Sequence, residues 1–553
     1  MTEGDALLRQ SLPLQTVTHT ALRDPPTAAM APGADPARPT PGPAWPDLGV
    51  IALVMSAALY ALSRTVADVD LWGHVKFGED IWRTGRIIQP DTYSYLTGGQ
   101  PWINHEWLAE VTFSGIFSSF GAPGLIAFKS GVGLLIVGLV YRHLCRWGLS
   151  AARAGVVVLL VAIMLIHGLG TMRPQLFTYL FFVVLLLLIH AAEHGRVRWL
   201  WFCPVLFALW ANLHGGFLVG VAILSIWSGV HIAALVRRAH TASALLSRST
   251  LTILAALTTS VLATLVNPYG AGLLRFLLRP ATLARPDISE WQPIAIMSFY
   301  GILYLAGLAA AGVGLLYSRI ERRPALLVLL ACIALLPLTA ERHGSLFALG
   351  MAVLAAEHMG SAWARWRATW PAHQEARRDR RRQLWSAAIA LAFAVAVIRW
   401  SLPHFSCIHL DPIVVAFPAR AVALLKDSGV SGNMAVLFDW GEYALWHLSP
   451  RIKVSVDGRR ETVYPDGVRT ENLNFLMGTN DWDAVLRNHD THLALVSKKR
   501  PTFNLMTLQP GWRLAYEDSV AATFAREDPP LIHQLRRTSP RDVPHDGKGL
   551  CFP

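Results

Sequence analysis

The sequence is short of charged residues. Only 16% of its 553 residues are Asp, Glu, Lys or Arg, whereas 53% are hydrophobic, and the mean hydropathy is +0.38. An average soluble domain contains about 25% charged residues. This shortage excludes an ordinary soluble domain and predicts a polytopic α-helical membrane protein.

Residues 1–46 lack any sustained hydrophobic periodicity. They are rich in Pro, Ala and Thr, a composition that buries too little apolar surface to fold, so a disordered cytoplasmic tail is predicted. The first long apolar segment begins only near Gly49, too far along the chain for a signal peptide, and no small-residue cleavage site follows it. We expect this segment to be retained as a helix.

Eleven apolar segments approach the length of about 20 residues that a helix needs to cross a bilayer. The ninth and the tenth are the shortest. The segments cover residues 48–67, 125–141, 154–170, 175–192, 199–213, 217–235, 251–266, 296–317, 325–338, 344–357 and 384–402. Together they define a predicted transmembrane domain over residues 47–402.

The net charge of +12 is concentrated in short loops between these segments. It is therefore a topology signal and gives no reason to expect a nucleic-acid partner. Every second loop is basic, which places these loops and the N-terminus in the cytoplasm and the C-terminus outside. The basic loops contain Arg142, Arg146 and Arg153; Arg196 and Arg198; Arg237, Arg238 and Arg248; Arg319, Arg322 and Arg323; and the run 364–383.

The five cysteines form no CxxC pair and no Cys/His spacing typical of a metal site. By the predicted topology, Cys145 is cytoplasmic and Cys203 and Cys332 lie within spans. Only Cys407 and Cys551 lie outside, where oxidising conditions permit a disulfide. These two cysteines are predicted to pair.

The loops on the predicted outer side hold most of the polar residues of functional interest. The first of them, residues 68–121, opens with two aspartates and contains two segments, 71–85 and 105–120, that are predicted interfacial helices. If the spans form one bundle, the polar residues of these loops meet at one face. The candidates are Asp68, Asp70, His74, His105, Glu106, Arg173, Gln175, Asn212, His214, Glu290, Arg342 and His343.

Residues 403–553 have ordinary charge density and short alternating apolar runs. The runs MAVLF, RIKVSVDG, HLALVS and WRLAYE are predicted strands, and residues 419–426 and 482–487 are predicted helices. About 150 residues suffice for an independent core. A separate extracytoplasmic α/β domain is therefore predicted.

The order of several motifs resembles the GT-C superfamily of glycosyltransferases. The motifs are DVDLWGHVKFGEDI, PWINHEWL, MRPQLFTYL, WANLHGG, LVNPYG, WGEYALWHL and VSVDGRR. A large outer loop that opens with acidic residues, many further spans and a C-terminal outer domain complete the likeness, which covers about residues 47–465. The superfamily includes oligosaccharyltransferases, protein O-mannosyltransferases and the aminoarabinose transferases of lipid A. The chain looks most like the bacterial GT-C-like membrane proteins.

The resemblance implies an enzyme of the bacterial inner membrane. It would transfer a sugar, usually with inversion, from a polyprenyl-phosphate or polyprenyl-diphosphate carrier to an extracytoplasmic glycan, lipid or protein. The acceptor hydroxyl needs a carboxylate to take its proton. The match to the first-loop acid of the family makes either Asp70 or Asp68 the candidate base.

The remaining candidates follow from the charge of the substrates. Cationic groups stabilise a leaving phosphate, which makes Arg173, Arg342 and His343 candidates for binding the carrier. If a divalent cation such as Mg²⁺ or Mn²⁺ takes part, its candidate ligands are Asp68, Asp70 and Glu106. The candidates for binding substrate are His74, His105, Glu106, Gln175, Asn212, His214 and Glu290.

Most of these residues also have a purely structural interpretation. Asp70 is placed to cap a helix that begins at Leu71, and Asp68 to end a span in water. The tryptophans of the first loop are typical anchors at a membrane interface. The glycines of NLHGG permit close helix packing, and Asp457 is placed as a turn residue.

Two other functions fit the same composition. A transporter or flippase of a lipid-linked substrate would have ionisable groups near the middle of its spans, and the predicted spans contain almost none. A non-catalytic membrane partner in envelope polysaccharide assembly would use its C-terminal domain for docking. Geometry distinguishes these functions, because an enzyme should have an aspartate of the first loop, Arg173 and His214 around one cavity.

Overall fold

The computed structural model describes residues 45–281, 289–369 and 380–553. Residues 45–553 form one compact unit. The predicted tail, residues 1–46, lies outside the described residues except for its last two. Part of the basic run 364–383 also lies outside them.

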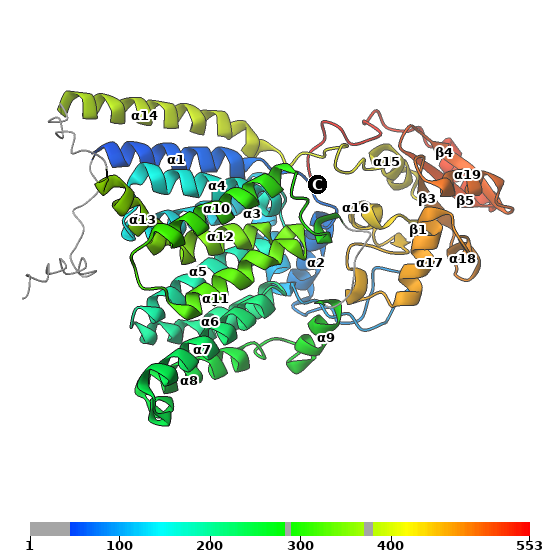
Figure 1. The fold of residues 1–553 in the computed structure, drawn as a ribbon. Coiled ribbons are helices and arrows are strands. Elements are labelled where there is room, and N and C mark those ends of the chain that lie inside the picture. The colour runs from blue at the N-terminus through cyan, green and yellow to red at the C-terminus, as the bar shows by residue number, and fades with distance from the viewer. Residues whose placement is uncertain (1–44, 282–288, 370–379) are drawn as a thin grey trace, which may run out of the picture. The chain divides into compact units, whose positions relative to one another are not determined.

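Helices occur at all eleven positions predicted from hydropathy (Figure 1). Six of the described helices are long and apolar enough to cross a membrane, and one bent pair makes a possible seventh; the others are shorter apolar helices. The chain is thus a multi-pass membrane protein, while the number of eleven spans and their orientation stay predictions. The helices are α1 (Trp45–Ser63), α3 (Trp107–Arg146), α4 (Ala151–Leu169), α5 (Gln175–Glu193), α6 (Cys203–Leu213, after η1, Val197–Phe202), α7 (Phe217–Ala239), α8 (Arg248–Ala263), α10 (Phe299–Tyr317), α11 (Pro324–Leu335, before η4, Leu336–Leu338), α12 (Gly344–Leu354) and α14 (Arg380–Ser401).

Two of these helical segments are broken. In α3, Gly121 has φ 63° and ψ −159°, which a residue with a Cβ rarely adopts, so the helical piece before it is separate from the span that follows. The predicted C-terminal end of the tenth span, residues 344–357, is wrong, because α12 ends at Leu354. There α13 (Ala356–Ala368) leaves α12 at an angle of 56° and packs along α10.

The first loop contains α2 (Leu71–Thr84), whose apolar side is buried inside the protein. Trp72 is fully buried, and its ring centroid lies 4.7 Å from that of Phe417 and 5.1 Å from that of Tyr443. The interpretation of Trp72 as an interfacial anchor is therefore wrong, because the C-terminal segment covers it. Trp82, in contrast, is 63% exposed.

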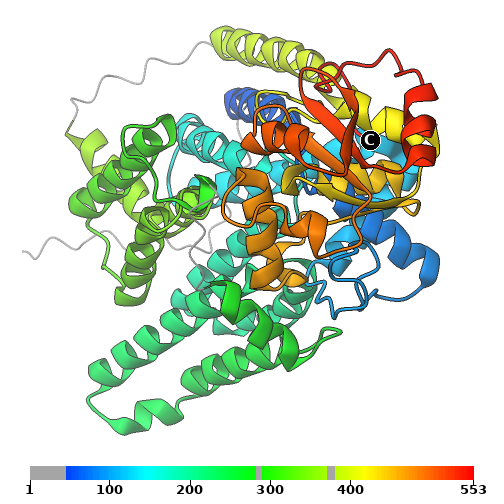
Figure 2. The ribbon, with the colours of Figure 1, turned by 90° about the vertical axis from the view of Figure 1, so that its right-hand side faces the viewer.

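Residues 403–553 contain one five-stranded sheet in the order β2-β1-β3-β5-β4 (Figure 2). The first three strands are parallel, whereas β5 is antiparallel to both β3 and β4. The four predicted strands are present, and β5 and several helices were not predicted. Cys407 and Cys551, the pair expected from the sequence, form a disulfide. The elements are α15 (Ala419–Ser428), β1 (Gly432–Val436), α16 (Phe438–Leu448), β2 (Ile452–Val454), α17 (Asp466–Met477), α18 (Ala484–Arg487), β3 (Leu493–Ser497), α19 (Pro501–Leu508), β4 (Trp512–Glu517), β5 (Ala521–Arg526) and α20 (Pro529–Arg537).

Backbone hydrogen bonds fix the start of the first loop. The amide of Val66 donates to the carbonyl of Gly170 at 3.0 Å, and the amide of Ala67 donates to the carbonyl of His409 at 2.8 Å. The loop therefore begins between the end of α4 and the start of the C-terminal region. Both neighbours determine where its aspartates lie.

Lys129, inside α3, is an exception to the predicted scarcity of charge within the spans. Its side chain is buried, and Nζ donates to the carbonyls of Arg64 at 2.9 Å and Leu169 at 2.7 Å. These carbonyls lie at the C-terminal ends of α1 and α4, where the helix dipole favours a cation. The lysine thus joins the two helix ends from which the first loop and the α4–α5 connection begin.

We expect Lys129→Met to lower the unfolding temperature of the detergent-solubilised protein. The substitution leaves the carbonyl of Leu169, in a buried hydrogen bond, without its donor, at a cost of about 1–3 kcal/mol, and it also removes the partly buried bond to Arg64. Lys76→Met is the control, because Lys76 pairs with the side chains of Glu79 and Asp80 on α2 outside the bundle. Equal unfolding temperatures for the two variants, measured by light scattering or intrinsic fluorescence, would contradict this role of Lys129.

Candidate active site

Asp68 and Asp70 lie in the turn between α1 and α2, and their contacts differ. Asp68 is buried, and its Oδ1 accepts the amide hydrogen of Asp70 at 3.0 Å, an arrangement that aspartate forms readily in turns. Asp70 is the N-cap residue of α2, but its side chain accepts no capping hydrogen bond from that helix. The capping interpretation of Asp70 is therefore wrong, and its carboxylate is left for other contacts.

Arg173, in the connection between α4 and α5, pairs with both aspartates. Its Nη2 lies 2.6 Å from Oδ2 of Asp68 and 3.5 Å from Oδ2 of Asp70. Its Nη1 lies 3.5 Å from Oε1 of Glu290, which belongs to η3 (Ser289–Trp291). One guanidinium thus brings together three loops that are far apart in the sequence.

Arg342, in η5 (Glu341–His343), lies on the other side of Glu290. Its Nη1 lies 3.3 Å from Oε1 of Glu290, and its Nη2 donates to Oε1 of Gln175 at 2.7 Å. The guanidinium also stacks over the ring of Trp291, 4.6 Å from the ring centroid. The carboxylate of Glu290 therefore lies between the guanidinium groups of Arg173 and Arg342.

A second polar group surrounds Glu106, at the end of the first loop. Its Oε1 lies 3.5 Å from Nε2 of His105 and 3.6 Å from Nε2 of His214. Nδ1 of His214 accepts the amide hydrogen of Gly216 at 3.0 Å. A neutral imidazole then carries its hydrogen on Nε2, facing Glu106. The second glycine of NLHGG thus orients His214.

The residues around Arg173 and those around Glu106 affect one another's pKa values. Burial raises the pKa of Asp70 to about 7, and the charge of Asp68 adds to this effect while that of Arg173 opposes it. The side chain of Asp70 is 26% exposed, so water screens part of the shift. Burial alone would raise the pKa of Glu106, but the imidazoles of His105 and His214 outweigh it and lower that pKa.

Two further histidines, His74 and His214, lie close to these acids. Nδ1 of His74 lies 3.8 Å from Oε1 of Glu110. Burial alone would lower the pKa of His74, but the hydrogen bond and charge of Glu110 and the charge of Glu106 raise it. Burial lowers the pKa of His214 to about 4. His214 is therefore neutral near pH 7.

Two predicted site residues are engaged elsewhere. The side chain of Asn212 donates to the carbonyls of Ala208 and Val266 at 2.8 and 2.7 Å and accepts from the indole of Trp107 at 3.0 Å. Through these hydrogen bonds, Asn212 connects the end of α6 to Val266 and to Trp107. Nδ1 of His343 lies 3.2 Å from the carbonyl of Leu336, the first residue of η4.

Glu442, in α16, was missed by the sequence analysis. It is 3% exposed, and its Oε2 accepts the amide hydrogen of Gly73 at 2.9 Å. Burial, and next the charge of Asp70, raise the pKa of Glu442 well above its usual value. The signal in the sequence was an acid between apolar residues within the motif WGEYALWHL. The C-terminal region thus supplies a buried carboxyl group beside Asp70.

Asp457 belongs to a second buried contact with the first loop. Its Oδ2 accepts from Nη2 of Arg459 at 2.7 Å, and Nη1 of Arg459 donates to Oδ1 of Asp91 at 2.8 Å. The guanidinium lies among the rings of Tyr93 and Trp102, 5.1 and 4.8 Å from their centroids. Asp457 is a turn residue, as predicted, since its Oδ1 accepts the amide hydrogen of Arg459 at 3.1 Å, and it also holds the guanidinium that pairs with the first loop.

The first-loop carboxylates do not form an open site for a hard divalent cation. Such a cation binds several carboxylate oxygens and waters directly. Here the guanidinium of Arg173 lies between Asp68 and Asp70 and supplies the positive charge. No step of the chemistry proposed below is therefore assigned to a metal.

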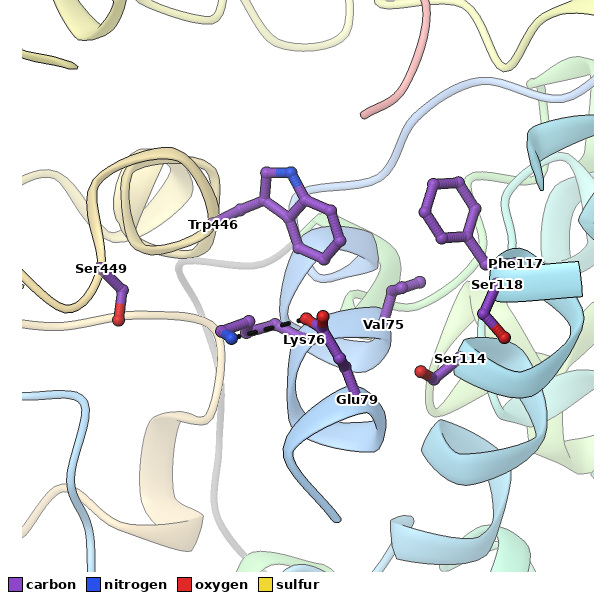
Figure 3. Close-up of a pocket in the computed structure, with 8 residues that line it drawn as sticks. All are labelled: Val75, Lys76, Glu79, Ser114, Phe117, Ser118, Trp446 and Ser449. Carbon is purple, nitrogen blue, oxygen red and sulfur yellow. Dashed lines mark hydrogen bonds and ion pairs between the residues drawn. The ribbon is translucent and has the colours of Figure 1, made fainter. Parts of the chain in front are cut away.

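A cavity of about 430 Å³ lies between α2, α3 and α16 (Figure 3). It is lined by Val75, Lys76, Glu79, Ser114, Phe117, Ser118, Trp446 and Ser449. These residues include none of the predicted site residues, so this hollow is separate from the acids and arginines. A cavity around the predicted residues remains a prediction, but six of them are joined by direct contacts: Asp68, Asp70, Arg173, Gln175, Glu290 and Arg342.

The fold, in contrast to the sequence, has clear relatives. No protein-family model and no curated protein matches the chain. The crystal structure of an oligosaccharyltransferase from Archaeoglobus fulgidus, tethered to an acceptor peptide with the NVT sequon, matches with a TM-score of 0.53. The match covers 81% of this chain and 68% of that chain at 14% identity. The chain has a GT-C glycosyltransferase fold.

This finding confirms the resemblance predicted from the order of the motifs. A second structure, ArnT from Cupriavidus metallidurans bound to undecaprenyl phosphate, matches at 15% identity with a TM-score of 0.48, over 86% of this chain and 97% of that chain. Identities this low establish the fold alone, since one fold can carry different functions.

The backbone at Gly458 provides a test of the contact between Asp70 and Glu442. A Cβ atom there would lie 2.3 Å from Oδ1 of Asp70 and 2.5 Å from Oε1 of Glu442. We expect Gly458→Ala to displace both carboxyl groups and to lower the unfolding temperature of the detergent-solubilised protein, because overpacking a filled site typically costs about 1–3 kcal/mol. Gly467→Ala, where a Cβ meets no atom within 4 Å, is the matched control. Equal unfolding temperatures for the two variants would show that the two carboxyl groups are not held against Gly458.

Proposed function

We propose that this protein is an integral membrane glycosyltransferase that transfers a sugar from a polyprenyl-phosphate-type donor to an acceptor hydroxyl. The observation that carries the proposal is the meeting of Asp70, Arg173 and Arg342 from three separate loops in a GT-C fold. The reaction would take place at the end of the helices where the first loop lies, which the arginine pattern predicts to be extracytoplasmic.

Asp70 is the better candidate for the base. Asp68 is held by a 2.6 Å contact with Arg173 and by the amide of Asp70, so its role is to position Arg173 and the turn. Asp70 has only the longer contact with Arg173. A pKa of about 7 suits a general base at neutral pH, because both proton uptake and proton release are then accessible.

The arginines are the candidates for holding the donor phosphate. Arg342 is the less neutralised of the two, since its shortest contact is with the neutral amide of Gln175. Glu290 lies between both guanidinium groups, and a donor phosphate oxygen would take a similar position. Charge that develops on the leaving phosphate would then be stabilised by both arginines.

The proposed step is a single displacement. The acceptor oxygen attacks the anomeric carbon as its proton moves to Asp70, and the bond between that carbon and the phosphate oxygen breaks. The carrier leaves as a phosphate or diphosphate, and the configuration inverts. Glu106 with His105 and His214, and His74 on α2, would orient the sugar or the acceptor, which is a glycan, a lipid or a protein.

We expect Asp70→Asn to abolish sugar transfer without changing membrane insertion or the unfolding temperature. An amide of the same shape cannot accept the acceptor proton, and loss of a general base costs about 10²–10⁴-fold. Asp68→Asn should also inactivate the enzyme, through Arg173. Glu79→Gln, on the exposed side of α2, is the matched control. Transfer is measured as loss of label from extracted polyprenyl-linked sugar, and a double variant with wild-type transfer would refute the proposal.

Transfer should also depend on pH through Asp70. The reactive form of a base is the deprotonated one, so a raised pKa delays its appearance until the pH approaches about 7. We expect the single-turnover rate to rise with pH through this region and then to level off. A rate that stays constant between about pH 5 and pH 9 would exclude Asp70 as the base.

A further inference from the structure

A second cluster of titratable side chains lies at the opposite end of α5 from the candidate active site. Gln175, the first residue of α5, contacts Arg342, whereas His190 is in the last turn of the helix. Fifteen residues of helix separate them, or about 22 Å. The chemistry proposed above uses no residue at this end.

Three potential metal ligands meet there. His190 and His194 are four residues apart, which places them on the same side of the chain as it leaves α5, and Glu357 comes from the first turn of α13. One ligand atom from each of the three lies within 4.8 Å of the other two. The two imidazole rings are nearly parallel, with centroids 4.6 Å apart.

The hydrogen bonds of His194 place two acceptor atoms, its own Nε2 and Oε2 of Glu357, next to each other. Its Nδ1 lies 2.8 Å from the carbonyl of His190 and must donate to it, because a carbonyl oxygen only accepts. In the neutral ring, Nε2 then has a lone pair, which points at Oε2 of Glu357 3.0 Å away. A positive charge has to lie between these atoms, and either a proton or a metal ion supplies it.

The other atoms of the cluster point to a ligand as well. Nε2 of His190 and Oε1 of Glu357 are buried and have no hydrogen-bond partner in the described structure, and the two residues are 2% and 1% exposed. The nearest cation candidate to Oε1 is Nε2 of His358, at 3.9 Å. Unpaired buried polar atoms are costly, so a shared ligand would satisfy the cluster better than one proton does.

We propose that His190, His194 and Glu357 bind a divalent transition-metal ion of the Zn²⁺ type. Two imidazoles and a carboxylate are a ligand set that Zn²⁺ favours. Tetrahedral Zn²⁺ holds its ligand atoms about 3.3 Å apart, so small side-chain rotations would close the site. The carbonyl of His190 fixes the tautomer of His194, as second-shell groups do in metal sites.

The fourth ligand of the ion would be water. Two further histidines lie close to the cluster. The ring centroid of His143 is 4.8 Å from that of His190, but its Nε2 is already 3.0 Å from the carbonyl of Val353. Nδ1 of His358 lies 3.0 Å from the hydroxyl of Ser318, and its Nε2 is 3.9 Å from Oε1 of Glu357. The metal would join α5 to α13 directly after the 56° bend, and α12, on the other side of the bend, begins next to Arg342. The ion would thus stabilise the bent pair from the end opposite the reaction.

The test is metal content and affinity, which do not depend on sugar transfer. The full chain is purified with a tag that contains no histidine, stripped with a chelator and titrated with Zn²⁺ and Co²⁺. We expect one equivalent to bind, with the strong visible absorption of four-coordinate Co²⁺ and a higher unfolding temperature. His190→Asn, His194→Gln and Glu357→Gln should each weaken binding about 100-fold or more, since even second-shell losses cost 10–100-fold.

His231→Asn is the matched control for these variants. Nδ1 of His231 lies 2.7 Å from Oε2 of Glu193, so this residue is another histidine of a His–Glu pair at the same end of the helices. It should retain one equivalent of metal. If the wild-type chain binds no equivalent of either metal, or if His231→Asn loses binding as the three variants do, the cluster is an ordinary protonated His–Glu pair and the proposal is wrong. The wild-type titration decides this even if a variant fails to fold.

Discussion

The arrangement of the candidate site depends on one guanidinium group. Arg173 lies between Asp68, Asp70 and Glu290, three acids that would otherwise repel one another in a partly buried place. Buried charges persist only when they are paired, so the arginine fixes where the three loops meet. The same junction is stabilised by two further sets of hydrogen bonds. Lys129 donates to carbonyls at the ends of α1 and α4, and the amide of Val66 donates to Gly170.

The helices were predictable because each span has to be apolar over its own length. A bilayer imposes this requirement locally, so hydropathy locates the segments without knowledge of their neighbours. The bend after Leu354 was not predictable in this way, since it results from the packing of α13 along α10. The strand β5 was missed for a related reason: its sequence AATFAR is buried by the sheet and shows no alternation.

The site was predictable where residue types and loop position agreed. Asp68, Asp70, Arg173, Glu290 and Arg342 lie together, as the outer-loop pattern indicated. The sequence did not predict which C-terminal residues contact the first loop. Glu442 and Asp457 belong to a region that was predicted to be a separate domain, and only the fold brings them to the first loop. The burial of Trp72 was not predicted for the same reason, because the rings that cover it belong to Phe417 and Tyr443 of the C-terminal region.

The contact between Asp91 and Arg459 has a consequence for biogenesis. The two residues are 368 positions apart, and all predicted spans except the first are synthesised between them. During translation the first loop leaves the ribosome with its carboxylates and aromatic rings uncovered, and it acquires its final shape only when the last third of the polypeptide arrives. A nascent or truncated chain therefore lacks the contacts that cover the first loop, and it leaves an exposed aromatic surface for chaperones to recognise.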